Sequence, residues 1–310
     1  MVAALRIPDQ MEAGPQTAAE LASATGAHPD RLRRLLRALA AEGVFEEDEK
    51  GRFAQTDFSR QLTGDSEERL MILGWRMLPE TYGAFADLLH AVRTGETAFD
   101  HVYGAPFQGY LLEHPDAGSA YETAMESTTD AFDEVVNAYD FSGLAHVADV
   151  GGGQGAFLVS LLRRHPEMRG TLFDQPGVVA GAPARLEAAG VADRVAVVGG
   201  DVFAEVPAGA DAYFTCTVLR CFEDDDCLRI LKNIRAAMGP GSRLVAVEQE
   251  VPEGPARRPY AMLDLHAMVV YGSRDRTAEE YRNLYALAGL ELTRVVPMGG
   301  PLSAFEGHAL

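Results

Sequence analysis

Apolar residues along this chain follow two different periods, and the period changes near residue 142. Before that point, apolar positions recur every three or four residues, which predicts amphipathic helices. After it, short apolar runs alternate with amphipathic segments, which is typical of a mainly parallel sheet covered by helices on both faces. We therefore expect a helical domain over 1–142 and an α/β domain over 143–310. Strands are expected at 146–150, 170–174, 194–199, 211–217 and 243–248.

The first sixty residues contain the pattern of a winged helix. Thr17 and Glu20 stand at the spacing of a capping box and predict a short helix over 17–25. A second helix is expected over about 29–42, where leucines repeat on one face. Residues 43–53 then read as a small hairpin with a charged tip.

A winged helix can bind DNA, and four arginines lie on the second predicted helix. The charge balance speaks against this function, because residues 1–100 hold 11 Lys and Arg against 17 Asp and Glu. The hairpin tip, Glu46-Glu-Asp-Glu49, would also bring four negative charges toward the phosphates. A dimerisation module with a solvated arginine face fits the same pattern better.

The whole chain of 310 residues carries a formal charge of -19, which also disfavours a nucleic-acid partner. No apolar run approaches the 18 residues of a membrane span, and the N-terminus lacks the layout of a signal peptide, so a cytoplasmic protein is expected. The three cysteines, Cys216, Cys221 and Cys227, are odd in number and lack metal-ligand spacing. We expect them to be buried as small apolar residues, and we expect no metal.

A glycine-rich turn between a predicted strand and helix carries the strongest chemical signal. Gly151, Gly153 and Gly155 allow a tight turn and a close approach of a ligand to the backbone. Asp174 ends the next strand, at about the 20-residue spacing of a carboxylate that binds ribose hydroxyls. Asp149 comes directly before the glycines, where a carboxylate would repel a pyrophosphate but suit an ammonium and a sulfonium. These residues favour S-adenosylmethionine (SAM) over NAD.

With these motifs, the chain resembles the small-molecule O-methyltransferases of the plant-caffeate and bacterial polyketide-tailoring type. The resemblance covers almost the whole length and implies a homodimer, with a winged-helix dimerisation domain joined to a doubly wound SAM-binding sheet. It also implies a hydroxylated aromatic or polyketide-like acceptor. Relatives begin with one or two further helices that embrace the partner subunit, which leaves the extent of the dimer open. The segments that carry the resemblance are 149–155, 194–203, 239–248, 262–268 and 272–277.

The resemblance also implies roles for individual cofactor-binding residues. Asp174 would take the ribose hydroxyls and Asp201 the adenine amino group, although Asp201 could instead cap a helix. Gly151 and Gly153 would contact the methionine part of SAM. The remaining positions expected around the cofactor are Asp149, Gln175, Val202, Phe203, Thr215 and Cys216.

The chain departs from the family at the usual catalytic base. Relatives place a histidine in a Leu-His-Asp-Trp run, and the aligned run here is Leu219-Arg-Cys-Phe222, so that Arg220 takes its place. A guanidinium is always protonated near neutral pH and cannot accept a proton from a phenol. A general base usually contributes about 10²–10⁴-fold to the rate, so the enzyme must forgo this contribution, relocate it or perform another reaction.

Three alternatives remain open from the sequence. Arg220 could bind or activate the acceptor in a reaction carried by positioning alone. His266 could serve as the base, or be an ordinary, partly buried helix residue. The enzyme could also retain SAM as a fixed cation, as a hydroxylase, decarboxylase or pericyclase would. A catalytically dead dimeric regulator on the same fold is a further possibility.

Two acids complete the expected catalytic set. Relatives use acidic residues at the positions of Glu248 and Asp275 to orient the base, and here either acid could pair with Arg220. Asp275 could equally be a solvated charge before the next helix. The acceptor pocket is expected to be apolar and aromatic, although such residues are more often plain core. The candidates are Trp75, Met77, Tyr82, Phe107, Met125, Phe132 and Met268.

Overall fold

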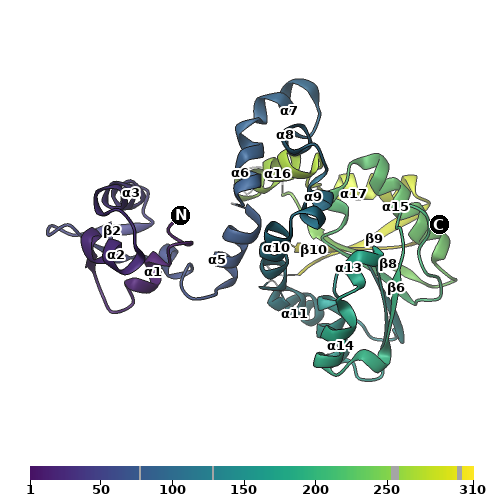
Figure 1. The fold of residues 1–310 in the computed structure, drawn as a ribbon. Coiled ribbons are helices and arrows are strands. Elements are labelled where there is room, and N and C mark those ends of the chain that lie inside the picture. Colours follow the sequence, from purple (N-terminus) through teal and green to yellow (C-terminus); the bar gives the residue numbers. More distant parts are fainter. Residues whose placement is uncertain (77, 128, 253–257, 299–301) are drawn as a thin grey trace. The chain divides into compact units, whose positions relative to one another are not determined.

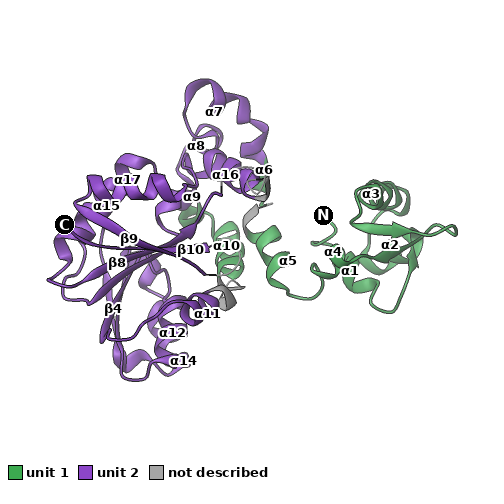
Figure 2. Cartoon of the chain, turned by 180° about the vertical axis from the view of Figure 1, so that it is seen from behind, with its two compact units in different colours: residues 1–82, 111–128 green, residues 83–110, 129–310 purple. Residues whose placement is uncertain are grey.

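The computed structural model describes residues 1–76, 78–127, 129–252, 258–298 and 302–310. The chain forms two compact units that interleave in sequence. The first contains residues 1–82 and 111–128, and the second contains residues 83–110 and 129–310 (Figure 2). No helix among the described residues is long and apolar enough to cross a membrane.

The N-terminal part of the first unit is a winged helix, as predicted. A three-stranded sheet in the order β1-β3-β2 flanks helices α2 and α3 (Figure 1). Thr17 caps α2 through the predicted capping box, since its side chain accepts from the Glu20 N–H while Glu20 accepts from the Thr17 N–H. The core of this part includes Leu21, Leu36 and Phe53, all without exposed surface. The elements of the unit are α1 (Ile7–Gln10), β1 (Gln16–Thr17), α2 (Ala18–Thr25), α3 (Pro29–Ala41), β2 (Phe45–Glu47), β3 (Arg52–Gln55), α4 (Asp57–Arg60), α5 (Glu67–Met71), the π-helix η1 (Ile72–Arg76) and α10 (Pro115–Ser127).

The second unit is built on a seven-stranded sheet in the order β6-β5-β4-β7-β8-β10-β9. All five predicted strands are present and parallel, with ends within two residues of the prediction. Two antiparallel strands at one edge, β9 and β10, were not predicted. The strands are β4 (His146–Val150), β5 (Arg169–Asp174), β6 (Val195–Gly199), β7 (Ala212–Cys216), β8 (Arg243–Gln249), β9 (Leu290–Pro297) and β10 (Leu302–Ala309).

Helices cover both faces of this sheet, which is the doubly wound arrangement that the alternating pattern predicts. One buried cluster joins the sheet to α11, α12 and α14, and a second joins it to α15 and α17 (Figure 1). The helical elements are α6 (Pro79–Ala86, which spans the boundary between the units), α7 (Leu88–Thr94), α8 (Ala98–Tyr103), α9 (Phe107–Glu113, which also spans it), α11 (Thr129–Ala138), α12 (Ala156–Arg164), α13 (Pro176–Val179), α14 (Ala182–Ala189), η2 (Ala192–Arg194), η3 (Leu219–Cys221), α15 (Asp224–Ala237), α16 (Arg258–Tyr271) and α17 (Ala278–Leu287).

The order in which strands are added to the sheet reverses at β4, the first strand of this sheet in the sequence. From β4 the chain proceeds outward to β5 and β6, then returns to pair β7 on the other side of β4. In such sheets, ligands bind where the order reverses, beyond the carboxyl ends of the strands. The glycine turn, Asp174 and the Arg220 segment follow the carboxyl ends of β4, β5 and β7, so the fold gathers them at this edge.

Candidate active site

The turn after β4 takes a shape that favours glycine. Gly151, Gly153 and Gly155 have φ angles of 74°, 59° and 85°, in the left-handed region that other residues rarely adopt. The Gly151 N–H donates to the Phe173 carbonyl at 2.8 Å and so ties the turn to the neighbouring strand. A Cβ on Gly151 would lie 2.7 Å from the Val218 side chain, so this position has no room for one.

Asp174 stands at the end of β5 and holds the same turn. Its carboxylate accepts the Gly153 N–H at 2.8 Å and the Gln175 N–H at 2.7 Å. Burial raises the pKa of Asp174, and the two backbone donors oppose this rise. Each oxygen of a carboxylate can accept more than one hydrogen bond, so this group could also bind the hydroxyls of a ribose. Gln175 is exposed and precedes α13.

Asp149 lies beneath the turn and has no exposed surface. Neither of its oxygens has a hydrogen-bond partner among the described residues. Burial raises the pKa of Asp149 to about 8, and the charge of Asp174 adds to the effect. A Cβ on Gly152 would overlap the Asp149 carboxylate, so this glycine leaves the space that the acid occupies. A buried carboxylate without a partner fits a cationic ligand, and the ammonium and sulfonium of SAM supply such charges.

Asp201, Val202 and Phe203 follow β6 at the same edge of the sheet. The exposed Asp201 carboxylate accepts the Phe203 N–H at 2.9 Å, so it caps a turn and not a helix. The Phe203 ring stands edge-to-face against Phe222, with centroids 5.3 Å apart. The Arg229 guanidinium lies 4.7 Å from the Phe203 centroid. These contacts hold the Phe203 ring in place as part of an aromatic surface.

The end of β7 brings Thr215 and Cys216 to this edge. Thr215 is fully buried and Cys216 is part-buried. The next residue, Thr217, has a φ of 56°, which is an uncommon backbone conformation for a non-glycine residue and often marks a functional site. Burial raises the pKa of the Cys216 thiol well above its ordinary value, so the thiol stays neutral.

The expectation that all three cysteines are buried is only partly met. Cys227 is fully buried, whereas Cys216 and Cys221 are part-buried.

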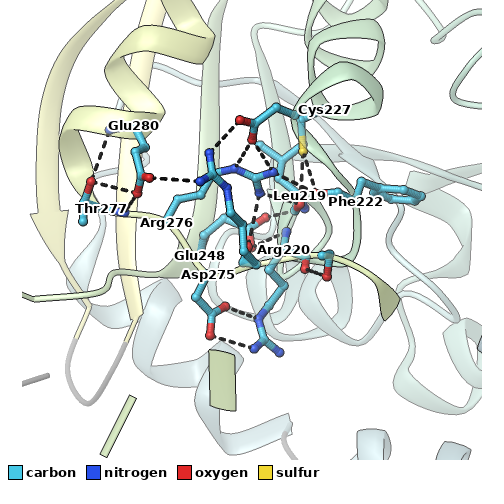
Figure 3. A network of polar contacts seen from close by, with 12 residues as sticks. Leu219, Arg220, Phe222, Cys227, Glu248, Asp275, Arg276, Thr277 and Glu280 are labelled. Atoms are coloured by element: carbon cyan, nitrogen blue, oxygen red, sulfur yellow. Dashed lines mark hydrogen bonds and ion pairs between the residues drawn. The ribbon is translucent and has the colours of Figure 1, made fainter. Parts of the chain in front are cut away.

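Arg220 forms a buried, bidentate ion pair with Asp275 (Figure 3). Its Nε donates to Asp275 Oδ1 at 2.8 Å and its Nη2 to Oδ2 at 3.1 Å. Burial by itself lowers the pKa of Arg220, but the hydrogen-bonded Asp275 outweighs it and holds the pKa above the usual value. The Gln249 amide also donates to Asp275 at 2.8 Å. Asp275 is therefore a buried partner of Arg220, and not a solvated loop charge.

Glu248 supports the backbone of the same segment, as Figure 3 shows. Its carboxylate accepts the N–H groups of Val218 at 3.0 Å, Leu219 at 2.7 Å and Arg220 at 3.4 Å. Burial raises the pKa of Glu248 to about 7 despite these donors. Of the two acids that could pair with the guanidinium, Asp275 does so, while Glu248 anchors the loop that carries Arg220.

Arg276 completes this network and was missed from the sequence. Its guanidinium has no exposed surface and donates to the carbonyls of Leu219 at 3.1 Å and Phe222 at 2.8 Å (Figure 3). It also pairs with Asp224, from Nε at 2.9 Å and Nη2 at 2.8 Å. The Ser273 hydroxyl donates to the Arg220 carbonyl at 2.7 Å. The segment 273–276 thus braces both sides of the Arg220 loop, which no local sequence pattern reveals.

His266 lies on α16 and is buried, with 4 % exposure. Its ring packs near Phe85 and Tyr271, with centroids 6.2 and 5.9 Å away. On the same helix, the Asp264 carboxylate accepts the Asp275 N–H at 3.0 Å. Helix α16 therefore carries His266 and also fixes the backbone of Asp275.

The expected acceptor-lining residues divide between the two units. Phe132, Met268 and Phe107 belong to the second unit, where Phe132 packs against Phe157 and Phe107 against Phe99 and Tyr271. Tyr82 is exposed in the first unit, and Met125 is part-buried there. Met77 and the Trp75 side chain lie outside the described residues.

Comparison with known proteins identifies the family. An O-methyltransferase domain matches residues 85–291, and an O-methyltransferase dimerisation domain matches residues 1–65. The chain is 40% identical, over its full length and 91% of the relative, to a phenazine O-methyltransferase of Lysobacter antibioticus. It is 35% identical, over 99% of its length and 84% of the relative, to an aclacinomycin 10-hydroxylase of Streptomyces purpurascens.

A solved structure agrees with this match. The O-methyltransferase of neocarzinostatin biosynthesis, in complex with SAM and 2-hydroxy-5-methyl naphthoic acid, superposes with a TM-score of 0.85. The two sequences are 34% identical, over all of this chain and 94% of that one. The chain belongs to the O-methyltransferase family and is a SAM-dependent methyltransferase with a winged-helix dimerisation domain.

Proposed function

We propose that this enzyme methylates a hydroxyl group on an aromatic or polyketide-type metabolite, and that Arg220 orients the acceptor in place of a histidine base. The buried Arg220–Asp275 pair carries the proposal, since it fixes a protonated group in the segment where relatives place their base. The similarity to the phenazine O-methyltransferase, and to the O-methyltransferase in complex with 2-hydroxy-5-methyl naphthoic acid, supports the acceptor class.

The cofactor roles rest on the geometry of the sheet edge. Asp174 takes the ribose hydroxyls, and Gly151 and Gly153 approach the methionine part. Burial keeps Asp149 mostly neutral near pH 7 in the ligand-free protein, and the approach of the ammonium and sulfonium favours its ionised form. Its lack of a partner among the described residues supports this role. Asp201, Val202 and Phe203 accommodate the adenine, with Gln175, Thr215 and Cys216 completing the surroundings of the cofactor.

When bound, SAM supplies an electrophilic methyl group, so the protein mainly has to position the acceptor oxygen in line with it. Asp275 holds the Arg220 guanidinium in one orientation. A planar guanidinium has five N–H donors and can serve a carboxylate and an acceptor oxygen at the same time. Its positive charge favours the ionised form of an acceptor hydroxyl, whose proton then passes to solvent. On this proposal, His266, Phe132 and Met268 shape the acceptor side within the second unit. The acceptor-binding roles of Trp75, Tyr82 and Met125 are predictions in the same way.

We also propose that the protein is a homodimer, because residues 1–65 match a dimerisation domain. Light scattering coupled to size exclusion tests this directly. A mass of twice 33.4 kDa is expected, and a monomer at working concentration would contradict it.

Hydroxylation with SAM as a fixed cation is the second candidate, favoured by the similarity to the aclacinomycin 10-hydroxylase. The two reactions differ in what happens to the cofactor. Incubation in air with methyl-¹³C SAM, a thiol as two-electron reductant, and a panel of hydroxyphenazines and hydroxynaphthoates should give labelled product and one S-adenosylhomocysteine per product. Hydroxylation would instead take one oxygen atom from O₂ and two electrons from the thiol, with the second oxygen atom leaving as water. A product that gains one oxygen, without S-adenosylhomocysteine, would replace methyl transfer by the second candidate.

A further inference from the structure

Two histidines on neighbouring helices of the second unit lie face to face. His90 is on α7 and His101 is on α8, with ring centroids 3.7 Å apart and planes inclined by 7°. His90 Nε2 lies 3.0 Å from Glu96 Oε2, and His101 Nδ1 lies 2.6 Å from Asp87 Oδ2. None of these residues takes part in the cofactor or acceptor chemistry described above.

We propose that Asp87, His90 and His101 form a binding site for a divalent transition-metal ion of the Zn²⁺ class. Each residue offers one ligand atom, and these atoms all lie within 4.8 Å of one another. Two imidazole nitrogens and one carboxylate oxygen are ligands that zinc accepts in proteins, with a fourth position for water or another carboxylate.

The charge of the cluster favours a cation. Three carboxylates, those of Asp87, Glu96 and Asp100, accompany the two histidines on this short segment. Zinc binding requires neutral imidazoles and ionised carboxylates, and the ion then balances the excess negative charge.

A bound ion would replace the hydrogen bonds that join His90 to Glu96 and His101 to Asp87. A nitrogen lone pair lies in the plane of its imidazole ring, so two parallel, stacked rings do not direct their lone pairs to one common position. Binding of one ion by both rings therefore requires a ring to rotate out of the stack. The surroundings leave room for His101 to rotate, because its side chain is 52% exposed, against 19% for that of His90. His101 also lines an open cavity of about 580 Å³ together with Glu96, Thr97 and Asp100.

A bound ion would fasten α7 to α8. The two helices are joined only by the turn Gly95-Glu-Thr97, and their side-chain bridge currently consists of hydrogen bonds and ring stacking. Coordination bonds would add a ligand-dependent contribution to folding stability. The cavity beside His101 is also lined by Glu223 and Gly272, which stand next to the segments that carry Arg220 and Asp275.

The test uses the full chain without an affinity tag, treated with EDTA and dialysed, and titrated with ZnCl₂ in a calorimeter. One ion per chain with micromolar or tighter affinity is expected, and Co²⁺ should give visible absorption bands of a low-coordinate site. His90→Gln and His101→Gln should each weaken binding by more than the roughly tenfold loss that even a supporting residue causes. His28→Gln, an exposed histidine in the first unit, is the matched control and should bind like the wild type.

The absence of binding heat, or equal binding by the wild type and the double variant H90Q/H101Q, would overturn the proposal. An equal loss of Zn²⁺ affinity in H28Q would also overturn the proposal, because it would mean that the ion binds to scattered surface histidines. Thermal unfolding provides a second readout, since Zn²⁺ should raise the Tm of the wild type but not of Asp87→Asn. This substitution preserves the size of the side chain, so a folding defect in the histidine variants would not prevent the test.

Discussion

The Arg220 guanidinium and the Asp275 carboxylate meet in a buried, two-pronged contact, with N–O distances of 2.8 and 3.1 Å. The two residues are separated by 55 positions in the chain. Desolvating such a pair costs free energy, and removal of one partner leaves an uncompensated buried charge. The contact therefore fixes the position of a permanent positive charge, which on the proposed function takes the place of a histidine base.

Arg220→Gln should lower kcat/KM for an identified acceptor by at least about tenfold, the smallest effect expected from the loss of a charged contact. SAM affinity should stay at the wild-type value, since the cofactor contacts lie on other residues. Steady-state kinetics and calorimetry measure the two quantities separately. Wild-type turnover in Arg220→Gln would exclude a role for the guanidinium, and weakened SAM binding would move its role to the cofactor.

Asp174→Ala should weaken SAM binding by roughly tenfold or more, because a charge-assisted hydrogen bond is worth about 1.5–3 kcal/mol. The substitution also frees the Gly153 N–H, which Asp174 now holds at 2.8 Å. Asp193→Ala, an exposed acid on η2, is the control and should bind normally. An unchanged dissociation constant for Asp174→Ala would refute the proposed ribose site.

Ligand-free protein should become less stable as the pH rises from about 4 toward 8, in part because of Asp149. Burial raises the pKa of this acid to about 8 in the folded state, whereas an unfolded aspartate has a pKa near 3.9. The folded state therefore binds more protons across this window, and the stability from the neutral carboxyl is lost as the pH passes about 8. Asp149→Asn should show a flatter dependence of Tm on pH. Parallel slopes for the two proteins would show that Asp149 does not titrate in this way.

Arg276→Met should destabilise the fold and loosen the Arg220 loop. The substitution removes the charged hydrogen bonds to the carbonyls of Leu219 and Phe222, each worth about 1.5–3 kcal/mol. Both carbonyls then keep only weaker donors, the Cys227 thiol on each and the Phe222 N–H on Leu219. Urea unfolding measures this loss, and acceptor turnover should fall while SAM affinity holds. Arg274→Met is a matched control, because Arg274 also pairs with Asp224 but is 44% exposed. Equal losses in both variants would show that the ion pair with Asp224, and not the carbonyl contacts, stabilises the loop.

The sequence by itself determined the elements whose signals are local. The five parallel strands follow from apolar runs of the right length, and α2 follows from the capping box of Thr17 and Glu20. The glycine turn and the position of Asp174 follow from residue type and spacing, because only certain residues fit a tight turn and a strand end. The family could be inferred from these motifs because they extend over most of the chain.

Only the tertiary structure decided how the charged residues pair. From the sequence, Asp275 could have been solvated and Glu248 could have paired with the guanidinium. The pairing was decided when the fold brought together the loop after β7, the end of β8 and the segment after α16. Arg276 and the stacked His90 and His101 carry no distinctive spacing, and their surroundings arise from separate elements. Strands β9 and β10 lack a continuous apolar run, since β10 contains the polar residues Ser303 and Glu306, which are buried against partners on other segments. Local patterns thus specify elements, whereas buried partners depend on which distant segments the fold places in contact.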